Sequence, residues 1–311
     1  MFTFIVGIVV IIVILYYIYM YCRGGVNINF PDLTDKVVVV TGTNRGIGYE
    51  TIRALAKLNA TIICCCRHEE AQIRVNMIIG KETKNNKLEF VKCDLMDLNC
   101  VKKAAQYIID KYHKVDILIT NAGIMCCPYT LSKQNIECQM ATNHIAHAAF
   151  INYLIPALKE SEKPRVVAVS SLAHLFTTNK SIDLIGKKED YQRAFRYFES
   201  KLAVGMFIHQ FAKEHPDIIA VHVHPGLVYS NLWRYWCPWL MWFVSPFFKI
   251  FWKTPEEACQ TTLHCALADD IQTGAYYSDC KIAKHNPIID DGILCQKLYK
   301  ETLDLIESNT Q

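Results

Sequence analysis

Short apolar runs alternate with longer amphipathic stretches along most of this chain. The apolar runs read as buried strands, and the stretches between them have apolar residues at helical spacing. Strands are expected at residues 36–42, 61–66, 88–94, 115–123, 165–171 and 218–226. Helices are expected at about 47–60, 68–80, 98–112, 135–160 and 190–213.

This alternation predicts the fold class. Strands that alternate with helices form a parallel sheet covered on both faces, and right-handed crossovers make it a doubly wound α/β domain of the Rossmann type. The chain has 311 residues, of which 51% are hydrophobic, and it shows no repeat and no linker rich in Pro or Gly. We therefore expect one domain over residues 35–311, with ligands bound beyond the carboxyl ends of its strands.

The amino terminus has a different pattern. Residues 2–21 carry no charge and as a helix would span roughly 30 Å, the thickness of a bilayer core. The segment lacks the basic start and small-residue cleavage site of a signal peptide. We predict a transmembrane anchor at residues 2–22, with a buried core helix as the alternative. Arg23 and Lys36 follow it, so the domain should face the cytosol, on the endoplasmic reticulum or a lipid droplet.

Charge and cysteine content narrow the function classes. The net charge of +3 gives no sign of a nucleic-acid partner. The 14 cysteines include neighbours such as Cys126 and Cys127, which do not suit a disulfide framework, so we interpret them as reduced and mostly buried. His222 and His224 share one face of a predicted strand, but no further ligands accompany them, and no metal site is expected.

The first strand ends in a glycine-rich turn, "TGTNRGIG", with Gly42, Gly46 and Gly48. Glycines allow backbone N–H groups to approach a pyrophosphate, and the following helix offers its positive N-terminus. At the second strand end the chain has Arg67 where an NAD-preferring enzyme usually has an acid. Together with Arg45 it suits a 2′-phosphate, so NADP(H) is expected rather than NAD(H). The counter-argument is Glu69 and Glu70, which we assign to the first helical turn.

These motifs occur in the order typical of one family. After "TGTNRGIG" come "CDL" (93–95), "NAG" (121–123), "NHIAH" (143–147), "VSSLAH" (169–174), "YFESK" (197–201) and "HPGLV" (224–228). From about residue 36 to 283 the chain resembles the short-chain dehydrogenase/reductase family. "VSSLAH" and the predicted anchor are most similar to its retinol-dehydrogenase-like branch. "RGG" (23–25) and "FWKTPEEA" (251–258) resemble a branch member proposed to act on polyprenols.

The resemblance implies a set of site residues. The catalytic residues would be Asn143, Ser171, Tyr197 and Lys201, with Ser170 as the alternative to Ser171. The cofactor would be bound by Gly42, Asn44, Arg45, Gly46, Ile47, Gly48, Arg67, Asp94, Leu95, Asn121, Ala122, Gly123, Tyr197, Lys201, Pro225, Gly226, Val228 and Ser230.

The chemistry can be argued from the residues themselves. Hydride transfer to a carbonyl leaves an alkoxide that needs a proton, and a tyrosine can donate it. A lysine one helical turn away favours the phenolate, and a serine can hold the substrate oxygen. The family resemblance further implies that Asn143 would hold a water that links Lys201 to solvent.

Four tyrosines precede a lysine by four residues: Tyr107/Lys111, Tyr129/Lys133, Tyr197/Lys201 and Tyr277/Lys281. The first pair lies on a helix at the wrong edge of the sheet, the second in a loop and the fourth after the last predicted strand. Only Tyr197/Lys201 follows the serine-bearing strand and opens a long helix. We therefore assign the chemistry to this pair.

A tryptophan-rich segment follows "HPG". All five tryptophans lie between residues 233 and 252, but Pro238 and Pro246 argue against a spanning helix. We expect a substrate lid at about 229–254 that rests in the membrane interface, or packs on its own core. The substrate should be a lipophilic alcohol or its aldehyde or ketone: a retinoid, polyprenoid, sterol or long-chain aldehyde.

Two other function classes stay open. One is a catalytically idle nucleotide-binding scaffold of the same fold, and the other is a sugar-nucleotide epimerase on a related fold. A homodimer is also left open.

Overall fold

A computed structural model describes residues 13, 23–26, 30–228, 231–235 and 252–310 of the 311-residue chain. The predicted anchor, residues 2–22, lies outside the described residues apart from Val13, and so does most of the predicted lid. Within the described ranges, no helix is both long and apolar enough to cross a membrane.

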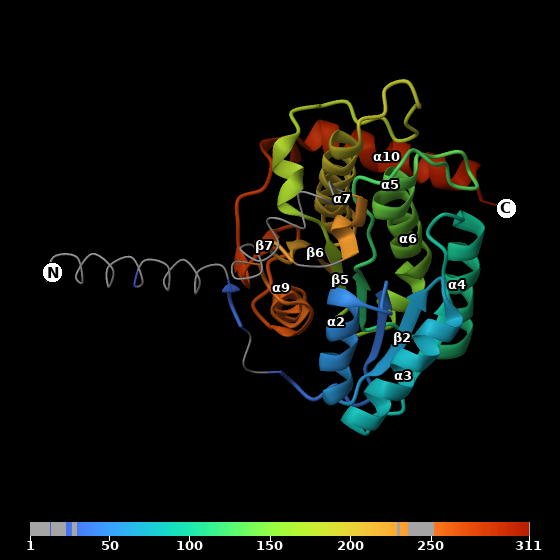
Figure 1. The fold of residues 1–311 in the computed structure, drawn as a ribbon, viewed down its shortest axis with the longest axis vertical. Coiled ribbons are helices and arrows are strands. Elements are labelled where there is room, and N and C mark those ends of the chain that lie inside the picture. The colour runs from blue at the N-terminus through green and yellow to red at the C-terminus, as the bar shows by residue number, and fades with distance from the viewer. Residues whose placement is uncertain (1–12, 14–22, 27–29, 229–230, 236–251, 311) are drawn as a thin grey trace, which may run out of the picture.

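An eight-stranded sheet forms the centre of the fold (Figure 1), with strand order β3-β2-β1-β4-β5-β6-β7-β8. Neighbouring strands from β3 to β7 are parallel, and β8 is antiparallel to β7. The strands are β1 (Val37–Thr41), β2 (Thr61–Cys66), β3 (Leu88–Lys92), β4 (Ile117–Thr120), β5 (Arg165–Val169), β6 (Ile219–His224), β7 (Tyr276–Ser278) and β8 (Lys281–Ile282). The predicted Rossmann-type α/β class and its parallel sheet are confirmed.

Alternate residues of the inner strands β1, β2, β4, β5 and β6 belong to two separate buried clusters, which explains why these runs are apolar throughout. In β1, Val37 and Val39 belong to one buried cluster, whereas Val38 and Val40 belong to the other. The first cluster lies against α4 (Leu98–Tyr112), α6 (Ala146–Lys159), α7 (Arg193–Glu214) and α10 (Gly292–Ser308). The second lies against α2 (Gly46–Lys57), α3 (Glu69–Thr83) and α9 (Pro255–Leu267).

The sequence prediction missed the last part of the domain. The sequence predicts that Tyr277 follows the last strand. In the structure it lies within a strand, β7, where it pairs with Val223 of β6. A strand of three residues has too little periodicity to be recognised, and only pairing with β6 defines it. The helix expected from about 135 begins at Cys138, because Glu137 caps it by accepting from Gln139 N and Met140 N.

The strand order places the site. The chain adds β2 and β3 on one side of β1 and then returns to add β4 on the other. The crevice between the carboxyl ends of β1 and β4 is the point where ligands bind in open α/β sheets. The glycine turn follows β1 directly, and Asn121, Ala122 and Gly123 follow β4.

Candidate functional site

A cavity of about 810 Å³ lies at this edge of the sheet. Exposed residues such as Phe176 and Leu227 form part of its wall, so it opens to the surface. The structure brings together nearly all of the predicted site residues in its lining: Gly42, Asn44, Arg45, Gly46, Ile47, Gly48, Arg67, Asp94, Leu95, Asn121, Ala122, Gly123, Ser171, Tyr197, Lys201, Pro225, Gly226 and Val228. Ser170 lines it too. Ser230 lies outside the described residues.

The glycine turn leaves backbone room at one end of the cavity. Gly46 has φ +60°, and a Cβ placed there would meet no atom within 4 Å. A Cβ on Gly48 would lie 2.2 Å from the carbonyl oxygen of Gly42, so the helix can approach the strand only with glycine there. No side chain caps the N-terminus of α2. Its first N–H groups therefore remain available to an anion, as a bound pyrophosphate requires.

Hydrogen bonds fasten the ends of β1 and β4 to each other. The buried Thr41 Oγ1 accepts from the backbone N–H groups of Asn121 and Ala122 at 2.9 and 3.0 Å. The Asn121 side chain in turn donates to the carbonyl oxygens of Thr41 and Gly42. The NAG motif thus holds the glycine turn in place at the switch point.

Two arginines line the cavity, Arg45 in the glycine turn and Arg67 directly after the second strand. Arg45 and Arg67 are both exposed, and among the described residues neither joins the ion pairs that arginines form with carboxylates. Glu69 and Glu70 occupy the first turn of α3, as expected. Glu70 pairs with Arg74 at 3.6 Å, and neither acid is part of the cavity wall.

The predicted tyrosine and serine lie within contact of each other. Tyr197 is buried in the first turns of α7. Burial raises the pKa of its hydroxyl to about 12, and a hydrogen bond with Ser171 partly offsets this rise. Ser170 instead donates its hydroxyl to the carbonyl oxygen of Lys201 at 2.9 Å. Because that hydroxyl has a structural partner on α7, the geometry favours Ser171 as the serine that acts with Tyr197.

Lys201 lies one turn further along α7, under the same cavity. Its Nζ donates to the carbonyl oxygen of Val169 at 2.9 Å and lies 5.9 Å from the centre of the Tyr197 ring. Burial lowers the pKa of Lys201 to about 8. A Cβ on Gly123 would lie 3.7 Å from Nζ, so the end of β4 borders the lysine directly.

Asn143 lies behind the cavity wall, in a π-helical segment, η1 (Ala141–Ile145), within an otherwise α-helical stretch. Such π-bulges often occur at functional sites. The Asn143 side chain uses both of its amide N–H groups, which donate to Ile124 O and to the hydroxyl of Ser200, and its oxygen accepts from Ile124 N. An amide oxygen has two lone pairs, so both Oδ1 and the backbone carbonyl oxygen of this residue retain room to accept from a water.

His147 is a residue whose place here the sequence interpretation missed. Its Nδ1 lies 3.2 Å from the Asn143 carbonyl oxygen, and its Nε2 lies 3.0 Å from Thr41 Oγ1. The bond to a carbonyl requires a proton on Nδ1, so Nε2 accepts from Thr41. His147 thus joins the π-helical segment to the fastened ends of β1 and β4. The only signal in the sequence was its spacing, four residues after Asn143.

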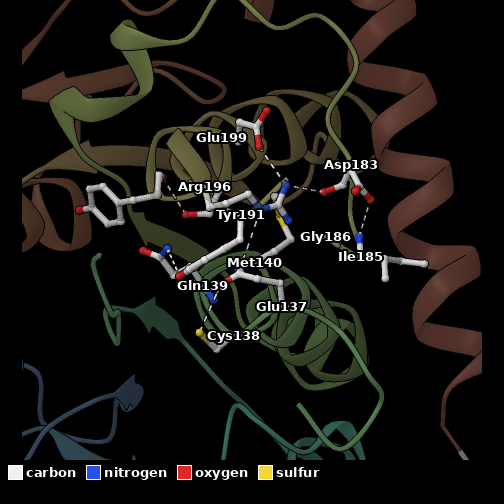
Figure 2. Close-up of polar contacts among 12 residues, drawn as sticks. Glu137, Cys138, Gln139, Met140, Asp183, Ile185, Gly186, Tyr191, Arg196 and Glu199 are labelled. Carbon is white, nitrogen blue, oxygen red and sulfur yellow. Dashed lines mark hydrogen bonds and ion pairs between the residues drawn. The ribbon is translucent and has the colours of Figure 1, made fainter. Parts of the chain in front are cut away.

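The second missed feature is a buried charge network around Arg196 (Figure 2), the residue that precedes Tyr197 in the chain. Arg196 lies with its Nε 3.5 Å from Glu137 and its Nη1 2.9 Å from Glu199. Nη1 also donates to the carbonyl oxygen of Asp183 at 3.0 Å. Glu137 is fully buried and Arg196 nearly so. The network ties the start of α7 to the helix at 138 and to the loop around Asp183, which fixes the segment that presents Tyr197.

The other three tyrosine–lysine pairs lie away from this cavity. Tyr107 and Lys111, on α4, both bond to Glu89, with Lys111 at 2.6 Å. Tyr129 lies in a loop, as predicted, and donates to the carbonyl oxygen of Gly186. None of these tyrosines, nor Tyr277, is part of the cavity wall.

Buried histidines around the site should make the fold sensitive to acid. Burial lowers the pKa of His144 and His147 to about 3, and that of His224 to about 4. A group whose pKa is lower in the folded state stabilises the fold fully above its unfolded pKa, near 6.5, and loses this effect as the pH falls toward the folded pKa. Each of these histidines should then lower the free energy of unfolding by about 1.4 kcal/mol for every pH unit below pH 6.5.

We therefore expect the free energy of unfolding, measured by urea titration, to fall steeply between pH 6.5 and 5. His144→Gln should reduce the slope of the free energy of unfolding against pH by about 1.4 kcal/mol per pH unit, the contribution of one proton. The substitution removes the buried titratable ring that contacts Thr302. A free energy of unfolding that is constant over this pH range would contradict this account.

Among the described residues, no group of three or more His, Cys, Asp or Glu side chains could hold a metal ion. His222 and His224 are both buried in β6. His224 Nδ1 accepts from Leu172 N at 3.2 Å, whereas the His222 ring lies 4.9 Å from that of Tyr276.

Comparison with known proteins agrees with this geometry. Residues 36–240 match the family model described as short chain dehydrogenase. Mouse retinol dehydrogenase 12 is 38% identical over 262 residues, which cover 83% of this chain and 82% of the relative. Human retinol dehydrogenase 11 is 34% identical and covers 91% of this chain and 89% of its own length.

Solved structures resemble the fold as a whole. A crystal structure of an uncharacterised protein from Mycobacterium paratuberculosis has a TM-score of 0.74 and 27% identity, over 91% of this chain and 98% of its own. The Pseudomonas aeruginosa RhlG/NADP active-site complex has a TM-score of 0.64 over 79% of this chain and 94% of its own; at 23% identity it shows the fold alone. By sequence and by fold, this chain is an oxidoreductase-type member of the short-chain dehydrogenase/reductase family, in its retinol-dehydrogenase-like branch.

Proposed function

We propose that this protein is a membrane-anchored, NADP(H)-dependent oxidoreductase that interconverts a lipophilic alcohol and its carbonyl compound. The observation that carries the proposal is that Ser171, Tyr197 and Lys201 converge in the wall of a cavity that the uncapped N-terminus of α2 also lines. This arrangement suits a dinucleotide that lies along the carboxyl edge of the sheet with its reactive ring beside Tyr197.

In carbonyl reduction the residues have separate tasks. Ser171 and Tyr197 donate hydrogen bonds to the substrate oxygen, which polarises the carbonyl. Tyr197, protonated at neutral pH because burial raises the pKa of its hydroxyl, transfers its proton to the oxygen as negative charge develops. Lys201 keeps positive charge near the phenolate that forms. The cofactor supplies or accepts the hydride.

Separate parts of the cavity wall suit separate parts of the cofactor. The glycine turn and the α2 N-terminus would bind the pyrophosphate, and Asp94 and Leu95, on the cavity wall, would border the adenine. Arg45 and Arg67, both exposed and both part of the cavity wall, suit the 2′-phosphate of NADP(H).

Arg67→Glu should reverse the cofactor preference toward NAD(H). The new carboxylate repels a 2′-phosphate and can accept hydrogen bonds from free ribose hydroxyls. We expect the Kd for NADPH, measured by fluorescence titration, to rise about 10- to 100-fold, as the loss of a charge-assisted hydrogen bond worth about 1.5–3 kcal/mol implies. Arg74→Glu is the matched control, since Arg74 lies on the exposed side of α3. An unchanged preference would contradict the assignment of Arg67.

A lipophilic substrate is supported by the cavity mouth and by the chain around it. Phe176, Phe198 and Leu232 lie in the cavity wall. The two ends of the predicted lid are held together. Lys253 N donates to Leu227 O at 2.8 Å, and Val228 and Lys253 form an isolated parallel β-bridge. Arg23, which follows the predicted anchor, pairs with Glu257 just after the lid at 2.5 Å. An anchor in the bilayer would thus set the mouth of the cavity near the lipid.

Retinoids come first among the lipids, because the similar curated proteins are named retinol dehydrogenases. Microsomes that contain this protein should oxidise NADPH when given retinal and form retinol. A panel of polyprenoid, sterol and long-chain aldehydes in the same assay ranks the other classes. If no lipid carbonyl is reduced while NADPH still binds, the protein is the idle scaffold instead.

A further inference from the structure

Two cysteine thiols lie against each other on the wall of the cavity. Cys127 Sγ and Cys138 Sγ are 3.1 Å apart. Both side chains are buried within the protein, and both line the cavity that opens to the surface. The reaction assigned to Tyr197 uses neither of them. A disulfide bond is about 2.05 Å long, so a movement of about 1 Å would bring the sulfurs to bonding distance.

The surroundings distinguish the two thiols. Cys138 is the first residue of the helix that Glu137 caps, and its Sγ lies 3.2 Å from Glu137 Oε1 (Figure 2). The hydrogen bond with Cys138 lowers the pKa of the Cys127 thiol below its ordinary value. The neighbouring Cys126 lines the same wall, but burial raises the pKa of its thiol to about 11.

Tyr191 fixes the backbone of this pair. Its hydroxyl donates to the carbonyl oxygen of Cys127 at 2.6 Å and accepts from Gln139 Nε2 at 2.9 Å. Gln139 Oε1 also accepts from Cys126 N at 2.7 Å. The loop that carries Cys127 and the helix that carries Cys138 are therefore fastened on both sides of the two sulfurs. This preorganisation reduces the entropy lost when a bond joins them.

We propose that Cys127 and Cys138 form a redox-active dithiol that a hydroperoxide converts into a disulfide in the cavity wall. The Cys127 thiolate attacks a peroxide oxygen, so that an S–O bond forms, the O–O bond breaks, and water or an alcohol leaves. Cys138 then attacks the sulfenic sulfur: the S–S bond forms, the S–O bond breaks, and hydroxide leaves with the Cys138 proton as water. Two electrons pass from the two thiols to the peroxide.

The disulfide would also affect Tyr197. Bond formation draws Cys138 away from Glu137, whose carboxylate pairs with Arg196, the residue before Tyr197. The same bond joins two residues of the cavity wall and so changes the shape of that wall. Oxidation should therefore lower turnover, and a dithiol reductant should restore it. Only this second part of the proposal depends on the proposed function.

The test is peptide mapping of the full-length protein after treatment with hydrogen peroxide, with and without dithiothreitol. We expect one cross-linked peptide pair that joins Cys127 to Cys138 and is lighter by two hydrogens. The pair should be absent from Cys127→Ser and Cys138→Ser, and present in the matched control Cys126→Ser. A wild-type protein without this cross-link, at a dose of peroxide that oxidises the exposed Met77, would overturn the site.

Retinal reduction is measured on the same samples. We expect at least a five-fold loss after oxidation in the wild type and in Cys126→Ser, recovery with dithiothreitol, and no such loss in Cys127→Ser. A mapped disulfide with unchanged turnover overturns the effect on activity but not the site. A protein that forms the disulfide but has no activity before oxidation counts against the proposed function alone.

Discussion

Tyr197→Phe is expected to abolish measurable turnover while NADPH still binds. The substitution removes a single hydroxyl, the one that would exchange a proton with the substrate oxygen. General acid–base catalysis by a positioned side chain contributes about 10²- to 10⁴-fold to the rate of the chemical step. The turnover rate should therefore fall by at least about 10²-fold. Steady-state assays with a lipid carbonyl measure the rate, and fluorescence titration measures the Kd for NADPH.

Tyr107→Phe is the control for this experiment. Tyr107 also precedes a lysine by one helical turn, but its hydroxyl bonds to Glu89 of β3 and is not part of the cavity wall. Its loss should leave turnover unchanged. Residual activity above one tenth of the wild type in Tyr197→Phe would show that another group donates the proton.

The largest effect on stability should come from Arg196→Met. This change leaves the fully buried carboxylate of Glu137 without its cationic partner. Breaking a buried ion pair by removing one partner costs about 3–5 kcal/mol. Urea titration should show that loss in the free energy of unfolding, and the loop at Asp183 should become more sensitive to proteases, because Arg196 donates to its carbonyl oxygen.

Arg74→Met is the matched control for that variant. Its pair with Glu70 is highly exposed on both sides, and such pairs contribute about 0–1 kcal/mol. An equal loss of stability in the two variants would mean that the buried network does not hold α7 in place.

Most of the residues that line the cavity could be predicted from the sequence, because their signals are local. Gly46 and Gly48 belong to one short motif, and the backbone geometry they permit is a property of glycine itself. The choice of Tyr197 among four candidates needed only the order of strands and helices, since position in a doubly wound fold follows from that order. The cavity now contains every predicted cofactor residue that the structure describes.

The remaining features depend on contacts between distant parts of the chain. His147 matters because Thr41, 106 residues away, lies beside its ring. Arg196 gains its partner Glu137 only when the helix at 138 packs on α7. Likewise β7 is too short for a periodic pattern and is defined by its ladder with β6. No rule based on neighbouring residues could have identified these partners.

Transfer of a labelled hydride tests the central claim most directly. The full-length protein in membranes is given NADPH in which both hydrogens at the nicotinamide C4 are deuterium, together with a lipid aldehyde such as retinal. The account predicts that the product alcohol carries the deuterium on its carbinol carbon with wild-type protein, and that none is transferred with Tyr197→Phe. Bound NADPH that transfers no deuterium to any retinoid, polyprenoid, sterol or long-chain aldehyde would contradict it.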